Sequence, residues 1–200
     1  MFRRSLAGAA LAALLALTGP AAAWQALMEP ADLAAALEAG EPVLLDIRSP
    51  AAYAEGHLPT AVNAPYAAFR GPEENPGALV SDAKLTAVLS EAGVAPDRGV
   101  VVTHAGKGPL DFGAAARVYW TLRSAGIARI AILNGGVAGW AAAGAPIETA
   151  EWTDFPSDAE FSVGEDWRIG REGIAAVLEG RRDALLLDAR TPDHFDGQRR

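Results

Sequence analysis

The chain alternates short apolar runs with segments of helical periodicity that end near a glycine, and this alternation constrains its fold most strongly. Val100–Val102 is a continuous β-branched run, as a strand buried on both faces requires. Strands are predicted at 43–45, 61–62, 100–102 and 130–133, and helices at 32–39, 82–93, 112–125 and 137–143. We therefore expect residues 28–148 to form an α/β domain with a mostly parallel central sheet flanked by helices.

The opening elements recur near the C-terminus. After an acidic and aromatic stretch at 149–166, which has the composition of a linker, residues 186–192 (LLDARTP) repeat residues 44–50 (LLDIRSP). A repeat at domain length indicates tandem domains. We expect 167–200 to be the incomplete start of a second copy, with a helix near 174–178 and a strand at 185–187, too small to bury its own faces.

The first 23 residues have the pattern of a secretory signal peptide. A basic start at Arg3 and Arg4 precedes an apolar run over 6–17, and three alanines at 21–23 suit a signal peptidase. The apolar run is shorter than the roughly 20 residues that span a bilayer. We expect cleavage after Ala23, a periplasmic or secreted protein, and no stable membrane anchor after cleavage.

Charge and cysteine content exclude several classes of function. The formal net charge is −8, with 17 Lys and Arg against 25 Asp and Glu, which argues against a nucleic-acid partner or an anionic membrane surface. The chain contains no cysteine, so it has no disulfide, no thiolate metal site and no cysteine nucleophile. Its three histidines are not clustered. We expect neither a metal nor a cofactor.

Three motifs carry a resemblance to a known family. They are Leu-Leu-Asp-Ile-Arg at 44–48, Tyr-Ala-Glu-Gly-His-Leu-Pro-Thr-Ala-Val-Asn at 53–63, and Leu-Asn-Gly-Gly at 133–136 with Trp140. Together they resemble the rhodanese family of sulfurtransferases. The helix around Trp120 looks most like the first half of two-domain thiosulfate or 3-mercaptopyruvate sulfurtransferases. The resemblance implies a rhodanese-like fold in which the first domain is catalytically silent and the second carries the cysteine.

The residue at the family's cysteine position explains why the first domain is expected to be inactive. Sulfur transfer needs a low-pKa thiolate that attacks a sulfane sulfur and holds it as a persulfide. The family places this thiolate directly after the central strand, where this chain has His104. In the loop that follows, Pro109 lacks a donor N–H and Asp111 puts a negative charge where an anion would bind. We expect no catalytic residue and no sulfur transfer in residues 28–148.

Other polar residues receive structural or binding roles. We expect Asp46 and Arg48 to form an ion pair at a strand end, and His57 to hydrogen-bond to nearby backbone. By resemblance, Arg190 faces an anionic substrate in the second domain, since a guanidinium fork suits thiosulfate or a carboxylate. His194 stands where the family commonly has a second substrate arginine, which leaves the choice of substrate open.

Three functions from different classes compete. In the first, this chain is the front portion of an exported tandem-domain sulfurtransferase that takes a small anionic sulfur donor, with its catalytic cysteine beyond Arg200. In the second, it is a catalytically inactive rhodanese-like module that binds a periplasmic protein partner. In the third, it is a phosphatase of the same fold. That chemistry also needs cysteine, so the absence of cysteine nearly eliminates the third.

Overall fold

A single parallel sheet organises the protein. The computed structural model describes residues 24–40, 42–153 and 156–199. The five strands lie in the order β1-β5-β4-β2-β3, and every pairing between them is parallel. Their bounds are β1 Leu27–Met28, β2 Pro42–Asp46, β3 Ala61–Asn63, β4 Gly99–Thr103 and β5 Ile130–Leu133. The predicted α/β class is confirmed, and β1 is a strand that the sequence pattern did not predict.

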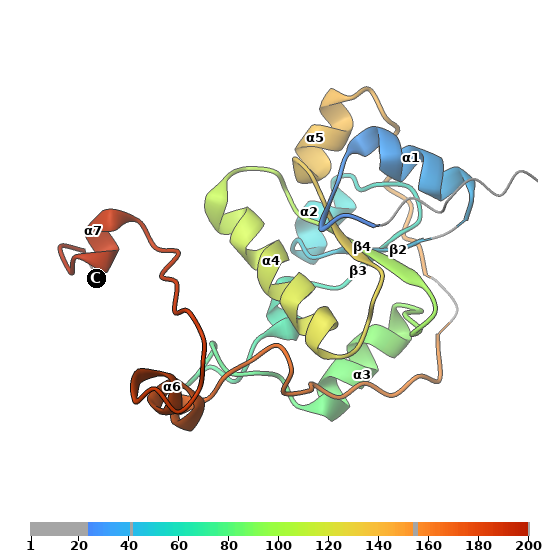
Figure 1. Ribbon diagram of the computed structural model, residues 1–200. Helices are drawn as coiled ribbons and strands as arrows, with labels where there is room; N and C mark the ends of the chain where they lie inside the picture. The colour runs from blue at the N-terminus through green and yellow to red at the C-terminus, as the bar shows by residue number, and fades with distance from the viewer. Residues whose placement is uncertain (1–23, 41, 154–155, 200) are drawn as a thin grey trace, which may run out of the picture.

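Helices cover both faces of this sheet (Figure 1). In chain order the helices are α1 Pro30–Glu38, α2 Pro50–Ala54, the 3-10 helix η1 Tyr66–Phe69, α3 Asp82–Glu91, α4 Pro109–Ser124, α5 Gly136–Ala142, α6 Arg171–Leu178 and α7 Pro192–Phe195, of which α6 and α7 do not contact the sheet. Val100 and Val102 pack toward η1, α3 and α4, whereas Val101 packs toward α1 and α5. Both faces of β4 are therefore covered, which explains why all five of its residues are buried and why its centre is three valines.

Local signals account for where the main helices begin. Ser81 caps α3, its hydroxyl accepting a hydrogen bond from the Lys84 backbone N–H at 3.3 Å. Helix α4 begins at Pro109, three residues before the predicted start, because proline is well suited to the first helical position. This early start places Asp111 in the first turn of α4, next to the loop that leaves β4.

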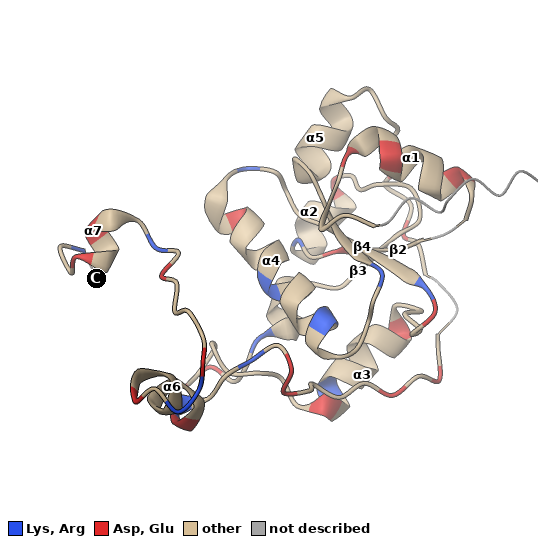
Figure 2. Ribbon diagram, viewed as in Figure 1, with Lys and Arg blue, Asp and Glu red and all other residues tan. Residues whose placement is uncertain are grey.

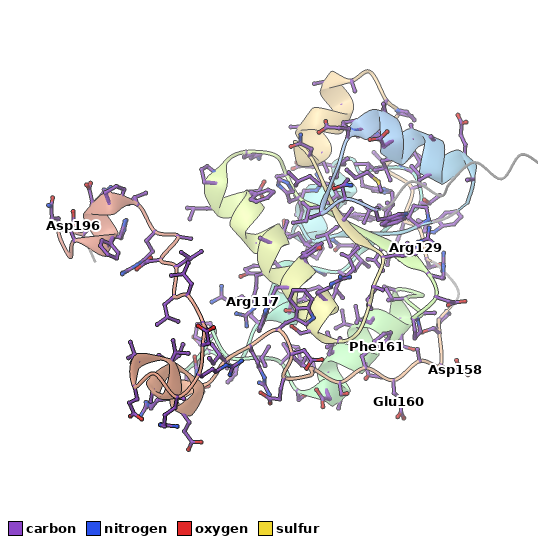
Figure 3. The ribbon with its side chains drawn as sticks, viewed as in Figure 1. Arg117, Arg129, Asp158, Glu160, Phe161 and Asp196 are labelled. Carbon is purple, nitrogen blue, oxygen red and sulfur yellow. The ribbon has the colours of Figure 1, made fainter. Side chains whose placement is uncertain are left out.

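Residues 156–167, here called the strap, run along α3 and α4. Phe161 is buried in the core on that side of the sheet, and its backbone N–H donates to the Thr86 hydroxyl at 2.9 Å. The Gly164 N–H donates to the Ser124 carbonyl at 2.8 Å. Figure 3 labels Phe161 beside α3. The segment predicted as a linker is thus largely packed against the first domain.

The segment 167–200, predicted to begin a second copy, has the predicted helix but not the predicted strand. Helix α6 includes the predicted residues 174–178, whereas Leu185–Leu187 is not a strand, and the side chains of Leu185 and Leu187 are each 82% exposed. A strand needs a neighbour to pair its backbone groups, and no described strand lies beside this segment. Figure 1 shows α6 and α7 at one side, away from the sheet.

The predicted signal peptide at 1–23 lies outside the described residues. Within the part of the chain that is described, no helix is both long and apolar enough to cross a membrane.

Candidate functional site

The loop after β4 and the first turn of α4 form an anion cradle, which we define as residues 104–111. Backbone N–H groups of Gly106 and Lys107 donate to Oδ2 of Asp111 at 2.6 and 3.1 Å, and the N–H of Ala105 donates to its Oδ1 at 3.3 Å. Converging N–H groups at a helix N-terminus bind anions. Here the bound anion is the chain's own carboxylate.

His104 holds the other side of this carboxylate. Its Nδ1 lies 2.8 Å from Oδ2 of Asp111, and because a carboxylate only accepts hydrogen bonds, Nδ1 carries the proton. The ring is 3% exposed and meets Phe112 edge-on at 5.8 Å. Its Nε2 is buried and has no hydrogen-bond partner among the described residues. An imidazole fixed in this way cannot form the persulfide that a thiolate would hold.

The charge on Asp111 is stabilised in place. Burial alone would raise the pKa of this carboxyl, but hydrogen bonds from His104, Lys107 and Gly106 outweigh it and hold the pKa below the usual 3.8. Asp111 is therefore ionised at neutral pH. A second anion entering the cradle would meet both a filled volume and a like charge.

The Gly135-Gly136 motif forms the rigid back of the cradle. The N–H of Val137 donates to the His104 carbonyl at 2.7 Å. A Cβ on Gly106 would lie 2.0 Å from the Gly135 carbonyl oxygen, and one on Gly136 would lie 2.2 Å from the carbonyl oxygen of His104. Both glycines also have positive φ, at +80° and +56°. These glycines are needed for the close approach of two backbone segments.

Asp46 and Arg48 form the expected ion pair at the end of β2. Arg48 Nε donates to Oδ1 at 2.9 Å and its Nη2 to Oδ2 at 2.6 Å, while Nη2 also donates to the Gly56 carbonyl. Asp46 is fully buried. The Asn63 side-chain amide donates to the carbonyls of both residues, which ties the end of β3 to this turn. The pair is therefore part of the scaffold of the sheet.

His57 makes the predicted backbone contact. It is fully buried, its Nδ1 lies 2.9 Å from the Leu58 carbonyl oxygen, and its ring stacks on Tyr53 at 3.8 Å. Its backbone forms an isolated antiparallel bridge with Glu148. No three metal-ligating side chains cluster within the described ranges.

Arg190 repeats the geometry of Arg48 on the protein surface. Its Nε donates to Oδ1 of Asp188 at 2.9 Å and its Nη2 to Oδ2 at 2.6 Å. The hydrogen bonds from Arg190 lower the pKa of Asp188 to about 2. His194 pairs with Thr191 through Nδ1 at 2.8 Å. Among the described contacts, no hydrogen bond or ion pair joins Arg190 to the cradle, and its role toward a substrate stays a prediction.

The fold and the site define a class: a parallel α/β domain whose central strand leads into an anion cradle. A family model described as a rhodanese-like domain matches residues 29–143. The chain belongs to the rhodanese-like family.

Within this family, the chain is similar to several named sulfurtransferases. The thiosulfate sulfurtransferase of Azotobacter vinelandii is 32% identical over 184 residues, and that of Pseudomonas aeruginosa is 32% identical over 172. Each match covers 86% of this chain and 62% of the relative, so the chain spans less than two thirds of these proteins. The crystal structure of the 3-mercaptopyruvate sulfurtransferase SseA from Escherichia coli shares the fold, with a TM-score of 0.69 at 22% identity, covering 86% of this chain and 68% of that one.

Proposed function

We propose that residues 28–148 are the catalytically silent first domain of an exported tandem-domain sulfurtransferase. Thiosulfate or 3-mercaptopyruvate is its sulfur donor, and the nucleophilic cysteine belongs to a later domain, beyond residue 200. One observation carries this proposal: the four hydrogen bonds from Arg190 to Asp188 repeat the four from Arg48 to Asp46, each within 0.1 Å.

The repetition extends beyond the ion pair. Ser49 and Thr191 stand at the N-cap of a short helix, and Pro50 and Pro192 are the first residues of α2 and α7. The local sequence thus folds in the same way twice, once inside a sheet and once without one. This is the behaviour expected of the start of a second rhodanese-like domain.

The occupied anion cradle supports the proposal that the first domain is catalytically inactive. A persulfide-bearing loop needs a thiolate and free N–H donors to stabilise the negative sulfur. Residues 104–111 supply an imidazole, and their donors are already bound to Asp111. We therefore assign this domain a scaffolding role beside a catalytic second domain.

The relatives support the tandem arrangement and the donor class. Their matches cover 86% of the chain, which is more than the family match over residues 29–143, so the similarity extends outside the first domain. Both are named thiosulfate sulfurtransferases. In the complete protein, the Arg190 guanidinium then contributes to binding the small anionic donor.

Export rests on the N-terminal pattern of the sequence. The basic start, the apolar run over 6–17 and the alanines at 21–23 support cleavage after Ala23 and a periplasmic or secreted location, with no membrane anchor left on the mature chain. N-terminal sequencing of the protein from an exporting cell tests this. We expect a mature chain that begins at Trp24; an intact Met1 on the exported protein would contradict it.

The nucleotide sequence after the Arg200 codon tests the tandem proposal directly. We expect the reading frame to continue through the rest of a rhodanese-like domain and to encode a cysteine directly after its central strand. A stop codon at that place would overturn the proposal. The competing function, an inactive module that binds a periplasmic protein, would then be tested by capture from a periplasmic extract.

A further inference from the structure

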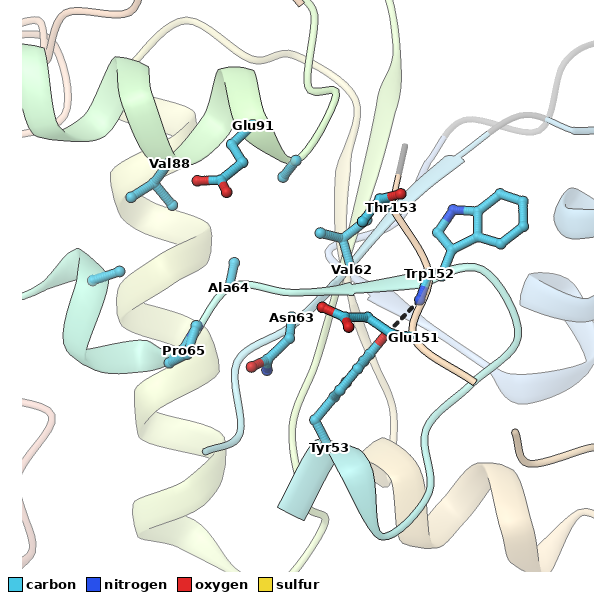
Figure 4. Close-up of a pocket in the computed structure, with 12 residues that line it drawn as sticks. Tyr53, Val62, Asn63, Ala64, Pro65, Val88, Glu91, Glu151, Trp152 and Thr153 are labelled. Atoms are coloured by element: carbon cyan, nitrogen blue, oxygen red, sulfur yellow. Dashed lines mark hydrogen bonds between the residues drawn. The ribbon is translucent and has the colours of Figure 1, made fainter. Parts of the chain in front are cut away.

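A cavity of about 260 Å³ lies at the end of the edge strand β3, outside the cradle. Its apolar lining includes Val62 of β3, Ala64 directly after β3, and Val88 of α3. Tyr53 of α2 and the segment 151–153 close the other sides. Figure 4 shows these side chains around the space, with none of residues 104–111 among those that line it. The cavity therefore has walls of its own, from four separate segments of the chain.

Two carboxylates at this cavity have no partner among the described residues. Glu91 reaches in from the end of α3 and Glu151 from the segment 151–153, with Val62 and Ala64 between them in Figure 4. Neither side chain has a hydrogen bond or an ion pair to any described residue. Of the described residues that line the cavity, none is Lys, Arg or His. The two negative charges are therefore uncompensated by the cavity's own wall.

The other polar groups at the cavity also favour a ligand that donates hydrogen bonds. The Asn63 amide uses its Nδ2 on the carbonyls of Asp46 and Arg48, which leaves its Oδ1 as an acceptor. The Tyr53 hydroxyl donates to the Ala61 carbonyl at 2.6 Å, so its proton is already committed. Burial raises the pKa of this phenol, which keeps it neutral. Apart from the Thr153 hydroxyl and the Trp152 indole N–H, the side chains that line this cavity offer a ligand only acceptors and an apolar wall.

We propose that this cavity binds a small organic cation, an ammonium or guanidinium group on a short apolar stem, with the cation between Glu91 and Glu151 and the stem against Val62, Ala64 and Val88. Opposite charge provides the selectivity, and the apolar wall favours an alkyl chain over a bare ion. A metal ion is disfavoured, since both glutamates are exposed and no third carboxylate joins them. This site is independent of sulfur transfer and of the proposed tandem arrangement.

Two isosteric ligands test the proposal on the chain as it stands. Butylguanidinium carries the cation and the stem, whereas butylurea has nearly the same shape without the charge. In ¹H–¹⁵N NMR spectra, we expect millimolar butylguanidinium to shift the backbone amides of Val62, Asn63 and Trp152, and butylurea to shift them much less. Equal shifts from both ligands would overturn the charge-based proposal. So would the absence of any shift at these three amides.

Glutamine variants locate the site. Glu91→Gln and Glu151→Gln should each weaken butylguanidinium binding about two- to fivefold, as loss of one partly exposed ion pair does, and the double variant should weaken it further. Glu160→Gln is the matched control, since Glu160 is an exposed carboxylate of the strap that does not line the cavity. Unchanged amide spectra without ligand show that each variant is folded. Equal affinity of the double variant and the Glu160→Gln control would overturn the assignment.

Discussion

The carboxylate of Asp111 occupies the position where the loop after β4 would otherwise bind an external anion. Three backbone N–H groups and the His104 imidazole all point to its carboxylate. If His104 stands at the family's cysteine position, as the sequence predicts, this loop has no nucleophile, and Asp111 fills the place where an anion would bind. Restoring a thiol alone would leave the donors engaged, so two changes separate this loop from an active one.

Asp111→Asn keeps the shape of the side chain and removes its charge. We expect a loss of about 1–2 kcal/mol in the free energy of unfolding at pH 7, because charge-assisted hydrogen bonds become neutral ones. The carboxyl has a lower pKa folded than its usual 3.8, so its contribution is present above about pH 4 and is lost as the pH falls through the folded value. Urea unfolding of both proteins at several pH values measures this. A stability difference that stays constant down to pH 2 would contradict the account.

The two Asp-x-Arg turns provide a matched pair of substitutions. Asp46→Asn leaves the guanidinium of Arg48, whose side chain is 11% exposed, without its carboxylate, and should cost about 3 kcal/mol. Asp188→Asn makes the same change in a solvated turn and should leave global unfolding unchanged. Urea denaturation compares them. Equal losses would show that burial does not decide the value of this ion pair.

At the scale of elements, the strap changes the boundary of the first domain. Phe161 contributes to the same core as α3 and α4, although it lies beyond the stretch that resembles a rhodanese-like domain. The domain that folds as a unit therefore extends to about residue 167. Truncation at residue 148 would remove a buried aromatic side chain from it.

Phe161→Ala tests whether the strap belongs to the fold. We expect a loss of about 3 kcal/mol in unfolding free energy, the usual cost of emptying a buried phenylalanine site. Phe195→Ala in α7 is the control, since that ring is 65% exposed and its removal should change nothing. Thermal or urea unfolding measures both. A stable Phe161→Ala protein would mean that the strap is only loosely attached.

Elements that depend on local sequence can be predicted from it. Elements and cavities that depend on contacts with distant segments cannot. β4 is predictable because three consecutive valines suit a strand with two covered faces. Leu185–Leu187 carries a similar signal, but no described strand lies beside it and it is not a strand, so the strand prediction there is wrong. The sequence correctly places His104 directly after β4 and predicts the negative charge that Asp111 brings to the loop. The cavity at β3 is not predictable, because four distant segments build it.

At the scale of the whole molecule, one finished domain is joined to a piece that exposes its apolar side. Leu178, Leu185 and Leu187 are each at least 74% exposed, whereas Val43 and Leu45 of β2, the counterparts of Leu185 and Leu187, are at most 2% exposed. Figure 2 shows the second piece carrying charged residues of both signs along an extended segment. Such a piece gains its buried faces only from further chain or from a partner.

We expect the rhodanese-like domain of this chain not to transfer sulfur. Thiocyanate formation from thiosulfate and cyanide by the purified chain tests it most directly. The account predicts a rate equal to the protein-free background, because residues 104–111 supply no thiolate and their N–H donors are held by Asp111. Thiocyanate production that rises in proportion to the concentration of the chain would contradict it.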